Sequence, residues 1–246
     1  QNFRQAENSG IPAAAMAVNS GEIPKEGADT DLDDFHFISR NDAEGCQTAI
    51  REFLSRLPVL RGGRYDHIRD VQVLTPMNKG PLGTSSLNPL IKNIVNPGTG
   101  EGFEVFDQVI SYGDKVIQVK NNYDKSVFNG DIGKVISLDQ KQLKVTVDFD
   151  GRSVDYDQSA LASNLSLAYA ITIHKSQGSE YPVVIMLVSK EHHFMLARNL
   201  VYTGLTRGRE LVFVIGQRDT LVKAARKVSN TRRWTLLPQA LAIQRE

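Results

Sequence analysis

Short apolar runs rich in β-branched residues are the feature that most constrains the fold of this chain. Runs of this kind, with little polar alternation, are typical of strands that are buried on both faces of a parallel sheet. Five of them occur, at Phe35–Ile38, Val71–Leu74, Tyr169–Ile173, Val183–Val188 and Leu211–Ile215. Because helical patterns lie among them, the sequence predicts an α/β fold with a parallel sheet and helices on both faces.

The clearest helical pattern covers Ala43–Leu57, where apolar residues recur every three to four positions. Asp42 directly before it is a candidate N-cap, since a carboxylate there can accept from free backbone N–H groups. Residues 87–94 repeat the pattern more briefly. A further helix is predicted after Arg218, beginning near Asp219 or Thr220.

The middle of the chain has a different pattern. No helical period is visible from about Phe103 to Asn164, where short strands alternate with turn signals. Asp150-Gly151 lies between two strand patterns and predicts a tight hairpin, because both central residues of such a turn need positive φ. We therefore predict a small all-β module at 104–163, inserted into one α/β domain made of 1–103 and 164–246.

Composition narrows the class of protein further. No apolar run approaches the roughly 18 residues that a membrane-spanning helix needs. The single cysteine, Cys46, excludes an intrachain disulfide and fits a reducing cytoplasm, which is the expected location. The chain opens on Gln1, and we interpret it as a fragment or as a trimmed start.

The net charge of +1 conceals an asymmetry. Residues 171–246 hold 12 Lys/Arg against 5 Asp/Glu, whereas residues 1–170 hold 17 against 23. A basic final third is compatible with a phosphate-binding surface. A solvated face that balances the acidic remainder explains the same numbers.

One polar segment, TIHKSQGSE at 172–180, directly follows a predicted buried strand. We expect its side chains at a sheet edge, where open α/β sheets hold their ligands. Thr172, His174 and Lys175 can donate to phosphate, and Gly178 allows a ligand to approach the backbone closely. Taken alone, His174 is equally explained as a structural histidine.

A second segment, LVYTGLTRGR at 200–209, leads into the last apolar run. Tyr202, Leu205 and Thr206 have helical spacing, and Gly208 is expected at the position after the helix end that favours left-handed backbone. Arg207 would then stand at a rigid helix end, where its guanidinium can fork onto an anionic oxygen. The alternative is a surface arginine that is favourable beside a helix C-terminus.

In this order, the two segments and the strands that follow them resemble motifs V and VI of superfamily 1 helicases. Other segments are similar to the RecD-like branch, in which the all-β module corresponds to an SH3-like subdomain. They are FRQAENS at 3–9, which resembles motif IV, VLTPMNKGPLG at 73–83 with Leu87-Asn88, GDKVIQ at 113–118, NNYDK at 121–125 and FNGDIG at 128–133. The resemblance spans nearly the whole chain. It implies the second RecA-like domain of a P-loop-NTPase-type motor with an SH3-like insert.

The resemblance also implies roles for individual residues. In this family ATP lies between two RecA-like domains, and the second domain supplies arginines that contact the γ-phosphate. By similarity these are Arg4 and Arg207. Gln177, Gly178 and Glu180 are expected beside the same cleft, with Glu180 accepting from the ribose.

Contacts to single-stranded DNA, with 5′→3′ translocation, are implied in the same way. Thr172, His174 and Lys175 match residues that couple the ATP cleft to the DNA backbone. Thr75, Pro76 and Lys79 are further candidates, although Thr-Pro is also an ordinary way to end a strand. In the β module, basic and aromatic side chains suit phosphate attraction and base stacking, or they are simply exposed-strand residues: Lys115, Lys120, Lys125, Lys134, Tyr123 and Phe128.

The chain departs from the family pattern at one decisive point. GxxxxGK[S/T] occurs nowhere in the sequence, and Gly130–Lys134 has the wrong spacing for it. No metal ligands are predicted either, so ATP and Mg²⁺ are expected to be held mainly by the N-terminal RecA-like domain, the partner within the same protein. We expect the chain alone to hydrolyse no ATP.

Two other interpretations of the sequence stay open. The chain could serve as a non-catalytic single-strand-binding or subunit-docking module of an exonuclease V-type complex. It could also be the helicase half of a protein fused to a relaxase. A phosphate loop encoded upstream would favour the motor, and a long nicking domain would favour the relaxase.

Overall fold

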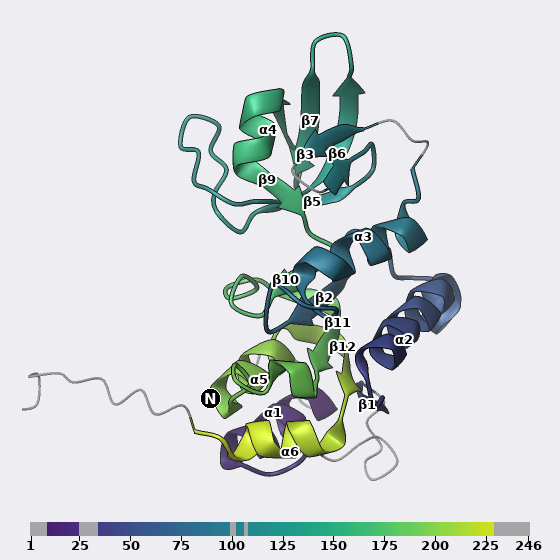
Figure 1. Ribbon diagram of the computed structural model, residues 1–246, viewed down its shortest axis with the longest axis vertical. Helices are drawn as coiled ribbons and strands as arrows, with labels where there is room; N and C mark the ends of the chain where they lie inside the picture. Colours follow the sequence, from purple (N-terminus) through teal and green to yellow (C-terminus); the bar gives the residue numbers. More distant parts are fainter. Residues whose placement is uncertain (1–8, 25–33, 99–101, 106–107, 229–246) are drawn as a thin grey trace, which may run out of the picture.

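The computed structural model describes residues 9–24, 34–98, 102–105 and 108–228. Within this part, a parallel five-stranded sheet has the order β1-β12-β11-β2-β10 (Figure 1). All five predicted strands are confirmed, with bounds β1 Phe35–Ser39, β2 Val71–Thr75, β10 Ala170–Thr172, β11 Tyr181–Val188 and β12 Gly208–Gly216. The predicted fold class is therefore confirmed for the sheet.

Helices cover both faces of the sheet, as predicted. The side chains of β11 alternate between two apolar cores, because successive residues of a strand point to opposite faces. Val183, Ile185 and Leu187 pack with helices α2 (Ala43–Arg56) and α3 (Thr84–Val95). Val184, Met186 and Val188 pack with α1 (Gly10–Ser20), α5 (Arg198–Leu205) and α6 (Arg218–Arg226).

The helix starts follow local capping chemistry. The Asp42 carboxylate accepts from Gly45 N at 2.7 Å, so the predicted N-cap of α2 is confirmed. Helix α1 was not predicted from its alanine-rich sequence; Ser9 caps it by accepting from Ile11 N, and Gly21 ends it at φ 83°. The described residues also contain two short 3-10 helices, Leu57–Gly62 (η2) and Lys190–His192 (η3).

The inserted module is built mainly of antiparallel strands between α3 and β10. One sheet has the order β8-β7-β6-β5-β9, and β3 pairs with β4. The bounds are β3 Phe103–Val105, β4 Gln108–Ile110, β5 Lys115–Gln118, β6 Ile132–Asp139, β7 Lys144–Phe149, β8 Arg152–Asp157 and β9 Leu165–Leu167. The β7–β8 hairpin turns at Asp150 (φ 50°) and Gly151 (φ 89°), as its sequence predicts.

The prediction that this region holds no helix is wrong. Gln158–Asn164 forms α4, capped by Asp157, whose carboxylate accepts from Ala160 N at 2.8 Å. At seven residues the helix is too short to show an apolar stripe, and Leu161 is its one buried residue. Its N-cap was therefore the only signal available in the sequence.

Side chains of α3 close the outer edge of the parallel sheet at β10. Asn88 donates to the Ala170 carbonyl at 3.0 Å and accepts from the Ala170 N–H at 2.8 Å. On β2, the buried Gln72 amide donates to the Ala168 and Tyr169 carbonyls at 3.0 and 3.1 Å. The two Asn88 bonds satisfy the Ala170 backbone groups that face away from β2, which would otherwise be costly to bury.

A buried carboxylate fastens the module to the parallel sheet. Asp114, which is fully buried at the start of β5, accepts from Lys92 Nζ of α3 at 2.6 Å and from the Tyr169 hydroxyl at 2.7 Å. Asn96 Nδ2 and Ser111 N donate to it at 2.7 Å each. Because these donors come from α3, the β4–β5 turn and the link to β10, one side chain joins three parts of the chain.

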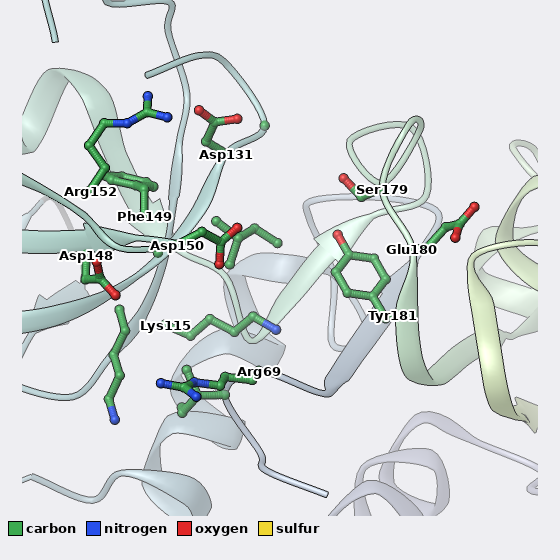
Figure 2. A pocket seen from close by; sticks show the side chains of 15 residues that line it. Arg69, Lys115, Asp131, Asp148, Phe149, Asp150, Arg152, Ser179, Glu180 and Tyr181 are labelled. Carbon is green, nitrogen blue, oxygen red and sulfur yellow. The ribbon is translucent and has the colours of Figure 1, made fainter. Parts of the chain in front are cut away.

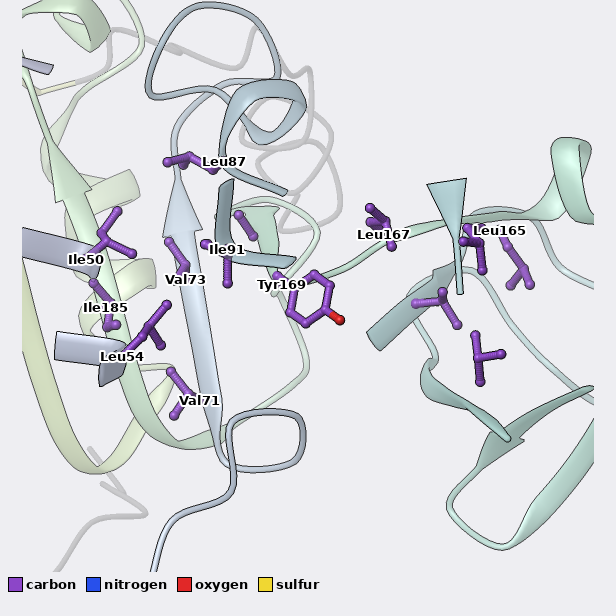
Figure 3. Packing of buried hydrophobic residues seen from close by; sticks show 14 of the residues in the cluster. Ile50, Leu54, Val71, Val73, Leu87, Ile91, Leu165, Leu167, Tyr169 and Ile185 are labelled. Carbon is purple, nitrogen blue, oxygen red and sulfur yellow. The ribbon is translucent and has the colours of Figure 1, made fainter. Parts of the chain in front are cut away.

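The apolar core is also continuous across this junction. Figure 3 shows Tyr169 between the core of the parallel sheet, with Val73 and Ile91, and the module residues Leu165 and Leu167. All five belong to one buried cluster. The inserted module is therefore packed against the α/β domain and is not only joined to it by the chain.

Substitution of Asp114 by alanine is expected to destabilise the chain by about 3–5 kcal/mol, because it leaves the Lys92 ammonium buried without its carboxylate. Urea unfolding monitored by circular dichroism measures this change. The control is Asp124→Ala at an exposed position of the same module, where we expect a change within about 0.5 kcal/mol. Equal midpoints for the two variants would show that the cluster contributes nothing to stability.

Candidate functional site

The polar segment between β10 and β11 runs from one edge of the parallel sheet to the other. Thr172 of β10 pairs with Thr75 of β2. On the other side of β2, Leu74 pairs with Met186 of β11, so Thr75 lies level with Leu187. Thr172 and Leu187 are therefore at the same height in the sheet. The chain re-enters the sheet at Tyr181, about six residues or roughly 20 Å back along β11. The prediction that these side chains share one edge is wrong, because a parallel crossover must return the chain to the amino edge.

At the amino edge, Arg207 directly precedes β12 and is half-buried. Its Nε donates to Thr203 O at 3.1 Å, one terminal nitrogen to Ser179 O at 3.0 Å and the other to Thr206 Oγ1 at 3.2 Å. These acceptors are carbonyl and hydroxyl oxygens and not carboxylates. A guanidinium has five N–H groups, so two of them are not used by these three bonds.

The end of the crossover segment, where other site residues were predicted, reaches the same edge of the sheet as Arg207. The Tyr181 N–H donates to Arg207 O at 2.9 Å, which brings Ser179 and Glu180 to the same edge. Gln177 and Gly178 are exposed, and Gly178 has φ 91° with open space around it. The loop therefore leaves its backbone accessible there.

Arg4 lies outside the described residues, so its predicted convergence with Arg207 stays a prediction. The first described residues stand at the amino edge as well. Gly10 N donates to Asp34 Oδ1 at 2.8 Å, and Asp34 directly precedes β1.

Gly208 has a different role from the predicted one. It is the first residue of β12 and its φ is not in the left-handed region, so it does not end α5. A Cβ built on it would lie 2.2 Å from Val212 Cγ2. Close packing, and not turn geometry, therefore requires glycine at this position.

At the carboxyl edge, three of the six residues predicted to contact nucleic acid are exposed and three are buried. Lys79, His174 and Lys175 are exposed. Thr75, Pro76 and Thr172 are buried, and the Thr75 hydroxyl donates to Leu82 O at 2.6 Å. Thr172 Oγ1 accepts from Lys175 N at 3.3 Å, so it shapes the loop that carries the exposed cation.

The basic and aromatic side chains predicted to contact nucleic acid in the module also divide into exposed and buried residues. Lys120, Lys125 and Lys134 are exposed. Tyr123 and Phe128 are also exposed, and their rings meet edge to face with centroids 6.0 Å apart.

Lys115 is the exception, because it is 1% exposed and its Nζ donates to Val71 O at 3.0 Å. The prediction that it lies on an exposed strand is therefore wrong. Burial lowers its pKa from the ordinary 10.5 to about 7, against the opposing effect of Asp66 and Asp70.

A pocket of about 500 Å³ lies between the module and the parallel sheet (Figure 2). Figure 2 shows Asp131 and Asp150 on the module side, Ser179 and Tyr181 on the sheet side, and Lys115 between them. The buried Tyr181 hydroxyl makes no hydrogen bond of good geometry within the described residues, and the Ser179 side chain lies beside it. This pocket could not be predicted from the sequence, because its walls come from segments far apart in the chain.

Two negative findings apply to the described part of the chain. None of its helices is long and apolar enough to span a membrane. No group of three or more His, Cys, Asp or Glu side chains in it could hold a metal ion.

Two protein-family models match parts of this chain, and both describe domains of helicases. Residues 167–215 match the UvrD-like helicase C-terminal domain, which covers both polar segments and Arg207. Residues 87–149 match the ATP-dependent RecD-like DNA helicase SH3 domain. The chain thus carries the C-terminal and SH3 domains of the RecD-like superfamily 1 helicases, and the predicted resemblance is confirmed.

Individual relatives agree with this assignment. The chain is 38% identical over 242 residues to the ATP-dependent RecD2 DNA helicase of Deinococcus radiodurans, covering 98% of the chain and 32% of that protein. It is 30% identical over 159 residues to the RecBCD enzyme subunit RecD of Mycolicibacterium smegmatis, covering 63% of the chain and 26% of the subunit. The chain thus spans about a third or less of these two relatives.

Among solved structures, the fold is similar to a Bacteroides Pif1 helicase in complex with ADP-AlF3 and ssDNA. The TM-score is 0.54 at 17% identity, with 100% of this chain and 56% of that chain covered. At this identity the likeness supports the fold alone.

The buried Lys115 gives a pH-dependent prediction. Its pKa is lower in the folded than in the unfolded chain, so the unfolded chain binds more protons between about pH 7 and pH 10 and the free energy of unfolding rises with pH there. Lys115→Met removes this contribution. From pH 7 to pH 9.5 we expect the wild type to gain on the order of 3 kcal/mol relative to the variant. Urea midpoints of both proteins at the two pH values measure the difference, and parallel pH profiles would contradict it.

Proposed function

We propose that the chain is the second RecA-like half of an ATP-driven DNA helicase and that Arg207 contacts the terminal phosphate of ATP. The observation that carries the proposal is the fixed Arg207 guanidinium at the amino edge of the sheet, held by three hydrogen bonds with two N–H groups remaining. A cation placed in advance stabilises the charge that builds up on a transferred phosphoryl group at little reorganisation cost.

The nucleotide itself is held mainly by another domain in this proposal. The sequence contains no phosphate loop, and the described residues offer no carboxylate cluster for Mg²⁺. The residues present fit the outer face of a bound triphosphate: Arg207, together with Arg4, would approach the γ-phosphate, and Gln177, Gly178 and Glu180 would lie beside it. The N-terminal RecA-like domain of the same protein is therefore the first partner, and the chain alone turns over no ATP.

Single-stranded DNA is proposed to cross the opposite, carboxyl edge. Exposed Lys79 and Lys175 supply charge there for the phosphate backbone, and exposed His174 can donate a hydrogen bond to it. The segment that carries His174 and Lys175 continues to Ser179, whose carbonyl accepts from Arg207. The DNA edge and the ATP edge are thus joined by one short stretch of backbone, which supports coupling between hydrolysis and movement.

A second candidate function is a subunit role in a larger complex of the exonuclease V type. The match to a RecBCD enzyme subunit RecD favours it. Size-exclusion chromatography of the full-length protein from its native cells distinguishes the two, since a motor that works alone elutes without stoichiometric partners.

Replacement of Arg207 by alanine in the full-length protein is expected to reduce DNA-stimulated kcat for ATP hydrolysis by about 10³–10⁵. Arg207→Lys keeps the charge but not the fork, so it should recover only part of the rate. Binding of single-stranded DNA without nucleotide should stay unchanged in both variants. A kcat within about ten-fold of wild type in the alanine variant would remove Arg207 from the proposed role.

Lys175→Ala is expected to weaken binding of the chain to single-stranded DNA and to lower the slope of log K against log salt by about 0.7, because one phosphate contact is lost. Fluorescence anisotropy over a salt series measures this slope. The matched control is Lys141→Ala, an exposed lysine in the turn between β6 and β7 at the far tip of the module (Figure 1). An unchanged slope in the Lys175 variant, or an equal loss in the control, would argue against the proposed path.

A further inference from the structure

A rigid loop at the carboxyl edge holds an aromatic ring out in solvent. The loop joins β11 to α5 and covers residues 189–197. Within it Phe194 is 83% exposed, the largest fraction among the exposed large apolar residues of the described chain, and neighbouring Met195 is 44% exposed. Holding such a ring in water forgoes the free energy of burying it.

The loop is fixed by hydrogen bonds on both sides of the ring. Lys227 Nζ donates to the carbonyls of His193 and Phe194 at 3.0 and 2.9 Å. Lys190 N donates to Gln217 Oε1 at 2.8 Å, and Met195 N donates to His192 O at 2.9 Å. The backbone that carries Phe194 is therefore ordered before any ligand arrives, which lowers the entropic cost of a contact.

The ring itself is also supported. The His193 imidazole lies against it, with ring centroids 3.8 Å apart and planes at 40°. The two rings belong to consecutive exposed residues, so they form one small aromatic platform. We use the name platform for His193 and Phe194 together.

The platform stands at the same edge as the exposed cations of the crossover segment. Val188 ends β11 one residue beyond the level of Thr75 on the neighbouring strand, and the loop begins there. Ile173 of the crossover and Leu196 of the loop belong to the same buried cluster, so both segments lie on the α5 side of the sheet. Lys175 and Lys190 are exposed in these two segments.

We propose that the platform stacks against one base of the single-stranded DNA that crosses this edge, and that the Phe194 ring makes the contact. The inference rests on the proposed function, and it adds a base contact that the two polar segments do not contain. Lysines attract the phosphate backbone, whereas every base offers a flat face to an aromatic ring whatever its sequence. A protein partner is disfavoured, because the other exposed residues of this loop include polar Lys190, Glu191 and His193, and only Met195 adds a large apolar side chain beside Phe194.

The test compares two strands that differ only in their bases. Anisotropy is measured for a labelled thymidine oligonucleotide of roughly 15 nucleotides and for an abasic strand of the same length. For Phe194→Ala we expect binding to the thymidine strand to weaken about five-fold or more, with binding to the abasic strand unchanged. Phe194→Trp should restore the affinity, because indole also stacks. Val59→Ala, at a 78% exposed position on the 3-10 helix after α2, is the control and should change neither.

The outcomes separate the two proposals. If the wild-type chain binds neither strand at low salt, both the DNA path and the platform are overturned. If the wild type binds and Lys175→Ala weakens binding while Phe194→Ala does not, the platform alone is overturned. Equal losses on the thymidine and abasic strands would also overturn it, because stacking requires a base.

Discussion

The return of the chain from β10 to β11 is the constraint on which the arrangement of this lobe depends. Parallel strands of one sheet that follow each other in the chain require a connection that carries the chain back to the amino edge, and most such connections use a helix. Here eight residues, 173–180, do so without one. A segment this short has little freedom, and buried Ile173 and Ser176 fix it to the sheet. Its polar residues are consequently divided between two edges that carry different groups.

This division explains how one lobe can present two kinds of surface. The amino edge carries Arg207 with Ser179 and Glu180, and the carboxyl edge carries exposed lysines and the Phe194 ring. The Arg207 guanidinium is held by the Thr203 and Ser179 carbonyls and by the Thr206 hydroxyl. A guanidinium that is positioned by neutral oxygens can still form charge-assisted hydrogen bonds to an anionic ligand.

Most of the fold could be predicted from the sequence, since buried parallel strands and the α2 stripe are strong local patterns. Element type followed from the continuous apolar run at β11, and the Asp150-Gly151 turn followed from its need for positive φ. What could not be predicted depends on contacts between distant segments. In the sequence, Lys115 has the pattern of an exposed strand lysine and Asp114 that of an ordinary turn carboxylate. Both are buried in the structure, because the module packs against the parallel sheet. Helix α1 lacks a clear polar face because apolar Ala13 and Met16 stand on its exposed side.

The candidate site was predictable in composition but less so in geometry. The family motifs identified Arg207 and the residues of the crossover, whereas the sequence could not show which hydroxyls are turned inward. Thr75 and Thr172 are buried and serve the loop structure, and that is a property of their neighbours. Phe194 belongs to no predicted motif. Its relevance to the site follows from the strand register, which places the β11–α5 loop at the same edge of the sheet as the segment that follows β10.

The Asn88 side chain has a consequence for how this lobe behaves in solution. The outermost strand of a sheet normally offers unpaired N–H and carbonyl groups on which another chain can form a strand, and such templates promote aggregation. At Ala170 both groups are already bonded to the Asn88 amide. The flank of the sheet next to the inserted module is thereby protected at this residue against the addition of another strand.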